Sequence, residues 1–289
     1  MSAAERVKSR AVSEDQTTPD PIPEIHLPMV HSGPIALLDL MHASLLFAQI
    51  SRISYLQPHA VDHYIPRLGL TCEHFADRDG AQAYIFGNDT DLIVACRGTE
   101  PNDWNDVKAD VNALMVLAET VGRVHRGFKR EVDDLWPALE EIIADDKRTL
   151  WFTGHSLGGA MATISAGRCF LAHIPATPQG VYTFGAPRVG TTRYINNVEV
   201  DLIRWVNNND IVPRVPPTWM GYRHTGRRLY INTYGNVRRM TKRQRAKDRW
   251  RGFFHGLKEG KVDHFSDHSM AGYVKHIAGA VQHAEHGPL

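Results

Sequence analysis

Short apolar runs recur through the middle of the chain and alternate with stretches of helical periodicity. The runs lie at 83–86, 92–96, 150–152, 181–184, 202–206 and 229–231, and Gly87-Asn88-Asp89 between the first two indicates a strand, a turn and a strand. Apolar residues at about 3.6-residue spacing predict helices over 37–48, over 128–143 and after Gly158. Near-continuous apolar strands that alternate with helices predict an α/β fold with a mostly parallel sheet covered by helices on both faces.

The first part of the chain has a different character. Residues 1–33 are polar, and prolines gather between 19 and 34, which disfavours regular structure. A helix start is expected at Ser32-Gly33-Pro34. We therefore predict a flexible, Pro-rich arm over 1–33 and a single domain over 34–289.

Composition excludes several classes of protein. With 43% hydrophobic and 22% charged residues among 289, the chain is neither fibrous nor wholly disordered. Lys and Arg number 33 against 32 Asp and Glu, a net charge of +1, so we predict no nucleic acid partner. No apolar run approaches the ~18–20 residues of a membrane span, and no hydrophobic stretch follows the N-terminal charges. The expected compartment is the cytoplasm, or the exterior if a signal has been removed.

Residues 238–257 form the most unbalanced segment in charge. Its first part is rich in Arg and Lys, and Ala246, Trp250, Phe253, Phe254 and Leu257 fall at helical spacing. This pattern predicts a basic amphipathic helix. Three roles fit it: a solvated face on a helix docked to the sheet, contact with an anionic lipid surface, or RNA binding.

A Gly-x-Ser-x-Gly pattern stands between a predicted strand and a predicted helix. It reads Gly154-His155-Ser156-Leu157-Gly158 and is typical of a nucleophile elbow, in which a strained turn projects the serine hydroxyl outward. Side chains at 154 and 158 would collide with the neighbouring strand and helix, which explains the glycines. The amides at the start of the helix, beginning with that of Leu157, would face a developing negative charge.

A nucleophilic serine needs a base, and the base needs an orienting carboxylate. Asp210 follows the strand at 202–206 in a loop rich in asparagine, where catalytic residues of parallel sheets lie. The chain has 16 histidines, and of those that follow Asp210 the two considered as the base are His264 and His268. We favour His268 as the base because it precedes a helical face made by Met270, Tyr273, Val274 and Ile277.

Five segments, in order, make the chain resemble the class 3 lipases, the filamentous-fungal type of triacylglycerol lipase. The match runs from about Ala81 to Val274. The segments are Val94-Ala95-Cys96-Arg97-Gly98-Thr99, Val124-His125-Arg126-Gly127-Phe128, Gly154 to Ala160, Tyr182 to Gly190, and Asn209-Asp210-Ile211-Val212-Pro213-Arg214-Val215-Pro216-Pro217.

The resemblance implies an α/β-hydrolase fold with Ser156 as nucleophile, His268 as general acid and base, and Asp210 as its orienting carboxylate. It also implies an oxyanion hole made by Thr99 and Leu157, and it implies neither a metal nor an organic cofactor. In the family the segment between Glu100 and Val121 is a lid. Trp104, Asp110 and Leu114 are the lid residues expected here, although a fixed helix packed on the core would show the same pattern.

The sequence therefore predicts a serine hydrolase of lipid carboxylic esters, similar to triacylglycerol lipases, which acts through an acyl-enzyme. The expected partner is a lipid ester, with a lipid–water interface or membrane surface contacted through the lid and the basic segment 238–257. Three alternatives remain: a short-chain or feruloyl esterase, a phospholipase on the same site, or a non-catalytic lipase-like binding protein.

Overall fold

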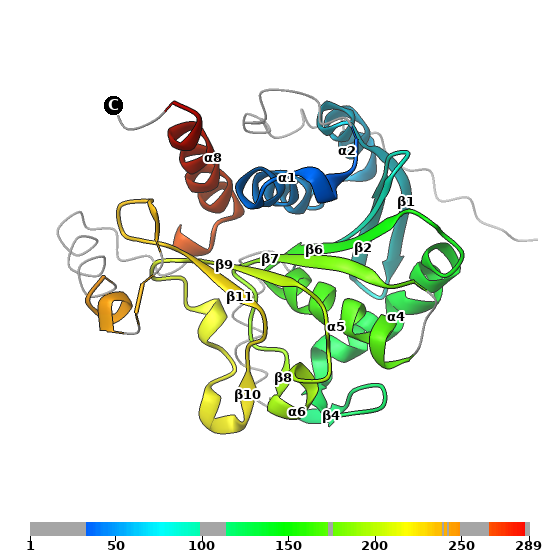
Figure 1. Cartoon of the computed structure of the whole chain (residues 1–289). Helices are drawn as coiled ribbons and strands as arrows, with labels where there is room; N and C mark the ends of the chain where they lie inside the picture. The colour runs from blue at the N-terminus through cyan, green and yellow to red at the C-terminus, as the bar shows by residue number, and fades with distance from the viewer. Residues whose placement is uncertain are drawn as a thin grey trace, which may run out of the picture.

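An eight-stranded sheet forms the centre of the molecule in the computed structural model, which describes residues 33–98, 114–172, 176–238, 240–241, 243–248 and 266–286. The strand order is β1-β2-β3-β6-β7-β9-β11-β12 (Figure 1). The strands are β1 Thr71–Arg78, β2 Ala81–Gly87, β3 Asp91–Cys96, β6 Thr149–His155, β7 Pro178–Phe184, β9 Leu202–Asn207, β11 Arg227–Ile231 and β12 Val237–Arg238. The five strands from β3 to β11 in this order are parallel, so the predicted sheet is confirmed.

Helices cover both faces of this sheet, as predicted. Figure 1 shows α1, α2 and α8 on one face and α4, α5 and α6 on the other. The helices are α1 Leu40–Ile53, α2 Pro58–Tyr64, α4 Arg126–Ile143, α5 Leu157–Leu171, α6 Thr192–Ile195 and α8 Met270–His286. Short 3₁₀ turns connect them: η1 Ile35–Leu37, η2 Ile65–Leu68, η3 Val212–Arg214, η4 Thr218–Met220 and η5 Ser266–His268.

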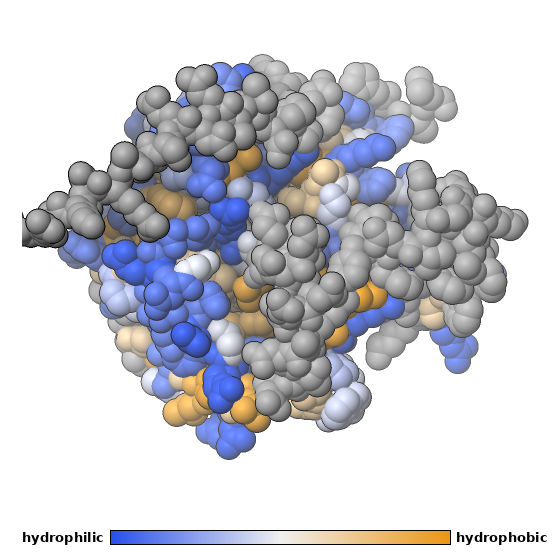
Figure 2. Space-filling view, turned by 180° about the vertical axis from the view of Figure 1, so that it is seen from behind, coloured by the Kyte–Doolittle hydropathy of each residue, from blue (hydrophilic) through white to orange (hydrophobic). Residues whose placement is uncertain are grey.

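A second, smaller sheet lies beyond α5 and has the strand order β10-β8-β5-β4. Its strands are β4 Met115–Leu117, β5 Arg123–His125, β8 Gly190–Thr191 and β10 Tyr222–Arg223. Large apolar side chains are exposed beside it: Leu114, Leu117 and, in η4, Trp219. Hydrophobic surface gathers at the lower margin of Figure 2, the level at which β4, β8 and β10 lie in Figure 1.

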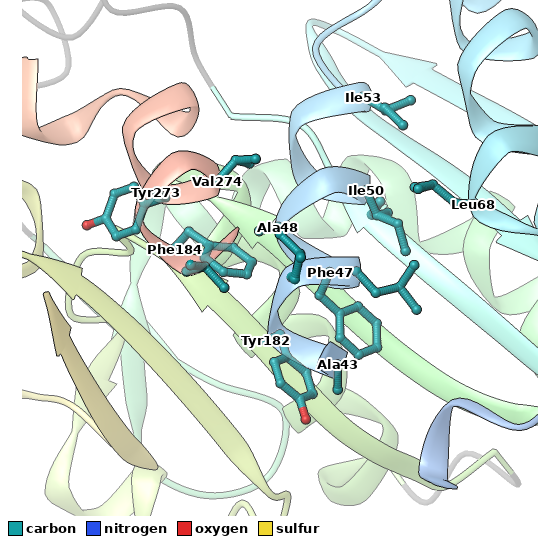
Figure 3. Close-up of a cluster of buried hydrophobic side chains, with 14 of the residues drawn as sticks. Ala43, Phe47, Ala48, Ile50, Ile53, Leu68, Tyr182, Phe184, Tyr273 and Val274 are labelled. Atoms are coloured by element: carbon teal, nitrogen blue, oxygen red, sulfur yellow. The ribbon is translucent and has the colours of Figure 1, made fainter. Parts of the chain in front are cut away.

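Two hydrophobic cores fill the layers on either side of the central sheet. One joins α1 and α8 to the sheet, with Phe47 stacked on Tyr182 at 4.3 Å between ring centroids (Figure 3). The other lies under α4 and α5 and includes Phe128, Leu139 and Phe152. Because both faces are covered, the central strands are mostly apolar on both sides, which is the pattern seen in the sequence.

The first long helix begins later than predicted. Pro34 introduces only the turn η1, and Leu38 is extended (φ −70°, ψ 142°). Helix α1 begins at Leu40, where the Asp39 side chain accepts hydrogen bonds from the N–H groups of Met41 and His42. A capping carboxylate satisfies free amides that a preceding proline cannot, so Asp39 sets the start. Residues 1–32 lie outside the described residues, and the division into arm and single domain stays a prediction.

The basic segment 238–257 does not begin as the predicted helix, because Arg238 ends strand β12 and residues 240–241 are not helical. It is helical over 243–248, and this part is docked through an acid. The buried carboxylate of Asp248 accepts hydrogen bonds from Tyr230 Oη (3.1 Å) and from the Thr233 N–H (3.2 Å). Arg245 is also buried, whereas Arg243 and Lys247 are exposed. The charges therefore do not all share one solvated face. Residues 249–257, the rest of the predicted amphipathic helix, lie outside the described residues.

Candidate active site

The Gly-x-Ser-x-Gly pattern forms a sharp turn between β6 and α5. β6 ends at His155 and α5 begins at Leu157, with Ser156 between them at φ 57° and ψ −128°. A side chain on Gly154 would lie 2.4 Å from the Gly158 carbonyl group in α5, and one on Gly158 would lie 2.2 Å from the Cys96 carbonyl oxygen in β3. These contacts are with backbone atoms, so only glycine fits at either position, as the sequence predicts.

The structure brings the three predicted site residues together although they are far apart in the chain. Ser156 Oγ lies 2.9 Å from His268 Nε2, and His268 Nδ1 lies 3.0 and 3.1 Å from the two carboxylate oxygens of Asp210. Ser156 and Asp210 have no exposed surface, and His268 is 3% exposed. In this arrangement Nδ1–H donates to Asp210, which leaves Nε2 free to accept the serine proton. His264, the alternative base, lies outside the described residues.

Asp210 is held by more than the histidine. The Val212 N–H donates to its Oδ1 (2.9 Å), and the Tyr273 hydroxyl donates to its Oδ2 (2.6 Å). Tyr273 Oη in turn accepts the Asn207 N–H at 3.0 Å. Burial, followed by the charge of Asp210, raises the pKa of Tyr273 well above its usual value, so the phenol remains a donor. The sequence placed Tyr273 on an apolar helical face and gave no sign of this contact.

His155 forms a second link into the site. Its Nε2 lies 2.7 Å from the His268 carbonyl oxygen, and its Nδ1 lies 2.8 Å from Tyr55 Oη. A carbonyl can only accept, so Nε2 carries the proton and Nδ1 accepts from the tyrosine hydroxyl. Complete burial and the nearby His268 lower the pKa of His155 well below its usual value, which keeps the ring neutral. Neither contact could be predicted, because Tyr55 and His268 are each about a hundred residues away.

The remaining predicted residues are only partly described. Leu157 is the first residue of α5, so its N–H has no acceptor within the helix and can serve a bound oxyanion. Leu114 is 47% exposed directly before β4. Thr99, Trp104 and Asp110 lie outside the described residues, so the second oxyanion donor and the lid stay predictions.

The described part of the chain also bears on metal binding, thiol chemistry and membrane insertion. There, no group of three or more His, Cys, Asp and Glu side chains is arranged to hold a metal ion. The three cysteines are free thiols, and burial raises the pKa values of Cys96 and Cys169 to about 12. Of the helices described, none is both long and apolar enough to cross a membrane.

Comparison with known proteins connects this geometry to a family. Residues 93–220 match the family model described as Lipase (class 3). The chain is similar to the toxin TseL of Vibrio cholerae serotype O1 (29% identity; 52% of this chain, 30% of the toxin) and to a lipase of Rhizopus niveus (32% identity; 44% and 35%). Among solved structures, the Rhizomucor miehei lipase propeptide complex superimposes with a TM-score of 0.61 at 23% identity, over 74% of this chain and 77% of that one.

Residues 93–220 therefore resemble the class 3 lipases, and the fold is the α/β-hydrolase fold seen in the fungal lipases. The resemblance inferred from the five sequence segments is confirmed. The chain spans about a third of the length of the two curated relatives described above.

Proposed function

We propose that this chain is a carboxylic-ester hydrolase in which Ser156, His268 and Asp210 form the catalytic triad. The observation that carries the proposal is the unbroken series of contacts from Ser156 Oγ through the His268 ring to Asp210, all of it buried. A serine hydroxyl is a poor nucleophile near neutral pH unless an oriented base takes its proton, and this geometry supplies both base and orientation.

In the proposed reaction, Ser156 Oγ attacks the ester carbonyl carbon while His268 Nε2 takes the hydroxyl proton. The Leu157 N–H, together with Thr99, holds the negative oxygen of the tetrahedral intermediate. Removing one such donor typically costs ~10²–10³ in rate. The C–O bond to the alcohol then breaks as His268 returns the proton to the leaving oxygen. Water, deprotonated by the same histidine, hydrolyses the acyl-serine and restores Ser156.

The substrate class that we propose is a lipid ester. The side chains of Leu114 (47%), Leu117 (60%) and Trp219 (83%) are exposed beside the small sheet, and such apolar surface favours contact with a lipid–water interface. Because Ser156 has no exposed surface, part of the chain above it has to move before an ester can reach it. Within the proposed lid over 100–121, residues 115–117 form β4 of the small sheet, so we propose that the residues before β4 supply that movement. The exposed Arg243 and Lys247 would add attraction to anionic lipid.

The test is hydrolysis of nitrophenyl esters from butyrate to palmitate, with and without a dispersed lipid interface. Ser156→Ala should lower the rate by at least ~10³-fold. Ser165→Ala is the matched control: Ser165 is buried in α5, the helix that follows Ser156, and its hydroxyl has no hydrogen-bond partner in the described structure, so activity should remain. Equal activity in wild type and Ser156→Ala would refute the triad and favour the binding-protein alternative.

The preferred acyl-chain length of the ester distinguishes a lipase from the alternative activities. A lipase should prefer the long esters and respond to the interface, whereas a short-chain or feruloyl esterase should prefer soluble esters. A phospholipase should release fatty acid from phosphatidylcholine vesicles. Leu114→Asn should lower activity on dispersed palmitate ester about 3–10-fold, the scale of one lost apolar contact, and should spare soluble butyrate ester. Leu37→Asn, at an exposed leucine in η1, should change neither.

A further inference from the structure

A groove runs between α8 and the turn that joins β11 to β12. Its volume is about 840 Å³, within the ~300–1,000 Å³ that is typical of small-molecule sites. Met41, in the first turn of α1, also lines it. α8 and β11 lie at the same edge of the molecule in Figure 1. The described residues that line the groove include no member of the hydrolytic site, so the groove is a separate feature.

The turn that forms one wall of the groove is held close to α8. Asn232 Oδ1 accepts the N–H groups of Tyr234 (2.9 Å) and Asn236 (3.0 Å), which fixes the turn. Gly235 has a φ of 76°, and a side chain there would lie 2.5 Å from His276 Nδ1 on α8, so this position requires glycine. The wall is therefore formed before a ligand binds, and a ligand does not have to order it.

The opposite wall, on α8, is lined by small residues. Gly279 and Ala280 face the groove, and Met41 and Val237 add further apolar surface. A side chain on Gly279 would meet no atom within 4 Å, so open space begins directly at the helix backbone. Methylene groups gain free energy when such surface takes them out of water. This part of the groove therefore suits a hydrocarbon chain.

The polar part of the groove carries positive charge. Arg238 on β12 and Lys275 on α8 are exposed and line the groove from its two walls, and no Asp or Glu is among the lining residues. Neither cation forms an ion pair with a described residue, so water solvates both and both are available to a ligand. Burial, followed by the charge of Lys275, lowers the pKa of His276, whose ring adds hydrogen-bonding groups without charge near pH 7.

The acids on the neighbouring elements are engaged elsewhere. Asp39, which caps α1, and Glu285 on α8 both contact His42, at 2.5 and 3.1 Å. Asp248 is buried and accepts a hydrogen bond from Tyr230 Oη. The groove therefore combines an apolar surface with two exposed cations, an arrangement that complements an amphiphile with an anionic head.

We propose that this groove binds a fatty acid, with its carboxylate between Arg238 and Lys275 and its hydrocarbon chain along α8 at Gly279. The choice of a fatty acid among anionic amphiphiles rests on the proposed function, because ester hydrolysis at Ser156 would release one. A fatty acid held in the groove leaves the catalytic triad free for the next ester.

The experiment is isothermal titration calorimetry of the Ser156→Ala protein with laurate at pH 7.5, below the concentration at which laurate forms micelles. A free fatty acid needs no hydrolysis to bind, so the result is independent of activity. Laurate should bind, whereas dodecyltrimethylammonium, which has the same chain and the opposite charge, should bind at least ~10-fold more weakly. Acetate, which has the carboxylate without the chain, should not displace laurate.

Two changes in the groove locate the binding. Lys275→Glu places a like charge beside the carboxylate and should lower the affinity for laurate ~10-fold. Lys147→Glu is its matched control: it makes the same change at an exposed lysine between α4 and β6, outside the groove, and should leave the affinity unchanged. Gly279→Leu fills the open space on α8 and should abolish binding, and the smaller Gly279→Ala should weaken it less. Neither should lower Tm, because both residues favour a helix more than glycine does.

Three results would overturn the proposal. One is the absence of laurate binding, and another is equal affinity for laurate and dodecyltrimethylammonium. The third is laurate binding that Lys275→Glu and Gly279→Leu both leave unchanged, which would place the fatty acid elsewhere. Binding of dodecyl phosphate at least ~10-fold tighter than that of laurate would refute the assignment to a carboxylate. If laurate binds through the groove but the nitrophenyl ester test fails, the site stands and the proposed hydrolysis does not.

Discussion

The side chain of His155 is hydrogen-bonded to the backbone of His268: its Nε2–H donates to the His268 carbonyl oxygen at 2.7 Å. The residue that precedes the proposed nucleophile therefore fixes the backbone of the proposed base. Tyr55, in the segment between α1 and α2, completes the link by donating to the other nitrogen of His155. A neutral ring with one fixed tautomer thus connects the start of the domain to the site.

His155→Phe should lower kcat about 10–100-fold with less than a threefold change in KM, because a ring without N–H leaves His268 free to shift, and small misplacements of a catalytic group cost up to ~10² in rate. Tyr55→Phe removes the hydroxyl that donates to His155 Nδ1 but keeps the His155 Nε2–H that donates to His268, so it should cost less. Steady-state kinetics on a soluble ester separates kcat from KM. An unchanged kcat in His155→Phe would show that the backbone of His268 is held by other contacts.

Tyr273→Phe should lower both activity and stability. It removes the donor to Asp210 and leaves the Asn207 N–H without its acceptor. An unsatisfied buried amide costs ~1–3 kcal/mol, so we expect that loss in the free energy of unfolding by urea, with kcat reduced about 3–10-fold. Tyr182→Phe is the control: Tyr182 is a buried tyrosine of the same core (Figure 3), and its hydroxyl makes no hydrogen bond to the described residues. Equal effects of the two changes would argue against a specific role for Tyr273.

Two glycines in helices should respond in opposite ways to alanine. Gly158→Ala places a methyl group 2.2 Å from the Cys96 carbonyl oxygen, so β3 and α5 have to separate, and we expect loss of at least ~3 kcal/mol of stability and of nearly all activity. Gly279 in α8 has no atom within 4 Å of the same position, so Gly279→Ala should gain ~0.5–1 kcal/mol from helix propensity. Urea unfolding of both variants tests this difference.

The contact of His42 with Glu285 predicts a pH-dependent link between α1 and α8. The hydrogen bond to Asp39, followed by that to Glu285, raises the pKa of His42 above 6.5. The stabilisation is therefore fully present below pH 6.5 and is lost as pH rises through the folded pKa. Glu285→Gln should lower the free energy of unfolding at pH 5.5 by at most ~1 kcal/mol, since the pair is partly exposed, and should have little effect at pH 9. Equal loss at both pH values would contradict an ionic contribution.

Much of the central sheet could be predicted because each of its parallel strands is buried on both faces. The runs at 92–96, 150–152, 181–184 and 202–206 each fall within an observed strand. β1 was missed because it is an edge strand with a single fully buried side chain, and the small sheet was missed because strands of two or three residues carry no periodicity.

Some residues of the candidate site could be predicted from local sequence, and others depend on contacts between distant parts of the chain. Ser156 and its glycines are specified by a local turn, and Asp210 and His268 stand next to strand and helix ends that the pattern reveals. Tyr273 and His155 read as ordinary residues of a helix face and a strand. Their roles depend on contacts with Asp210, Tyr55 and the His268 backbone that only the folded chain creates.

The backbone of Ser156 also restricts which chemistry this fold can acquire. At φ 57° a residue branched at Cβ is severely disfavoured. Threonine carries the same hydroxyl group and serves as a nucleophile in other hydrolases, yet at this turn its extra methyl group opposes the fold itself. Serine and cysteine are the nucleophilic side chains that the turn accommodates most readily, so evolution from this scaffold can exchange oxygen for sulfur far more easily than it can add one carbon.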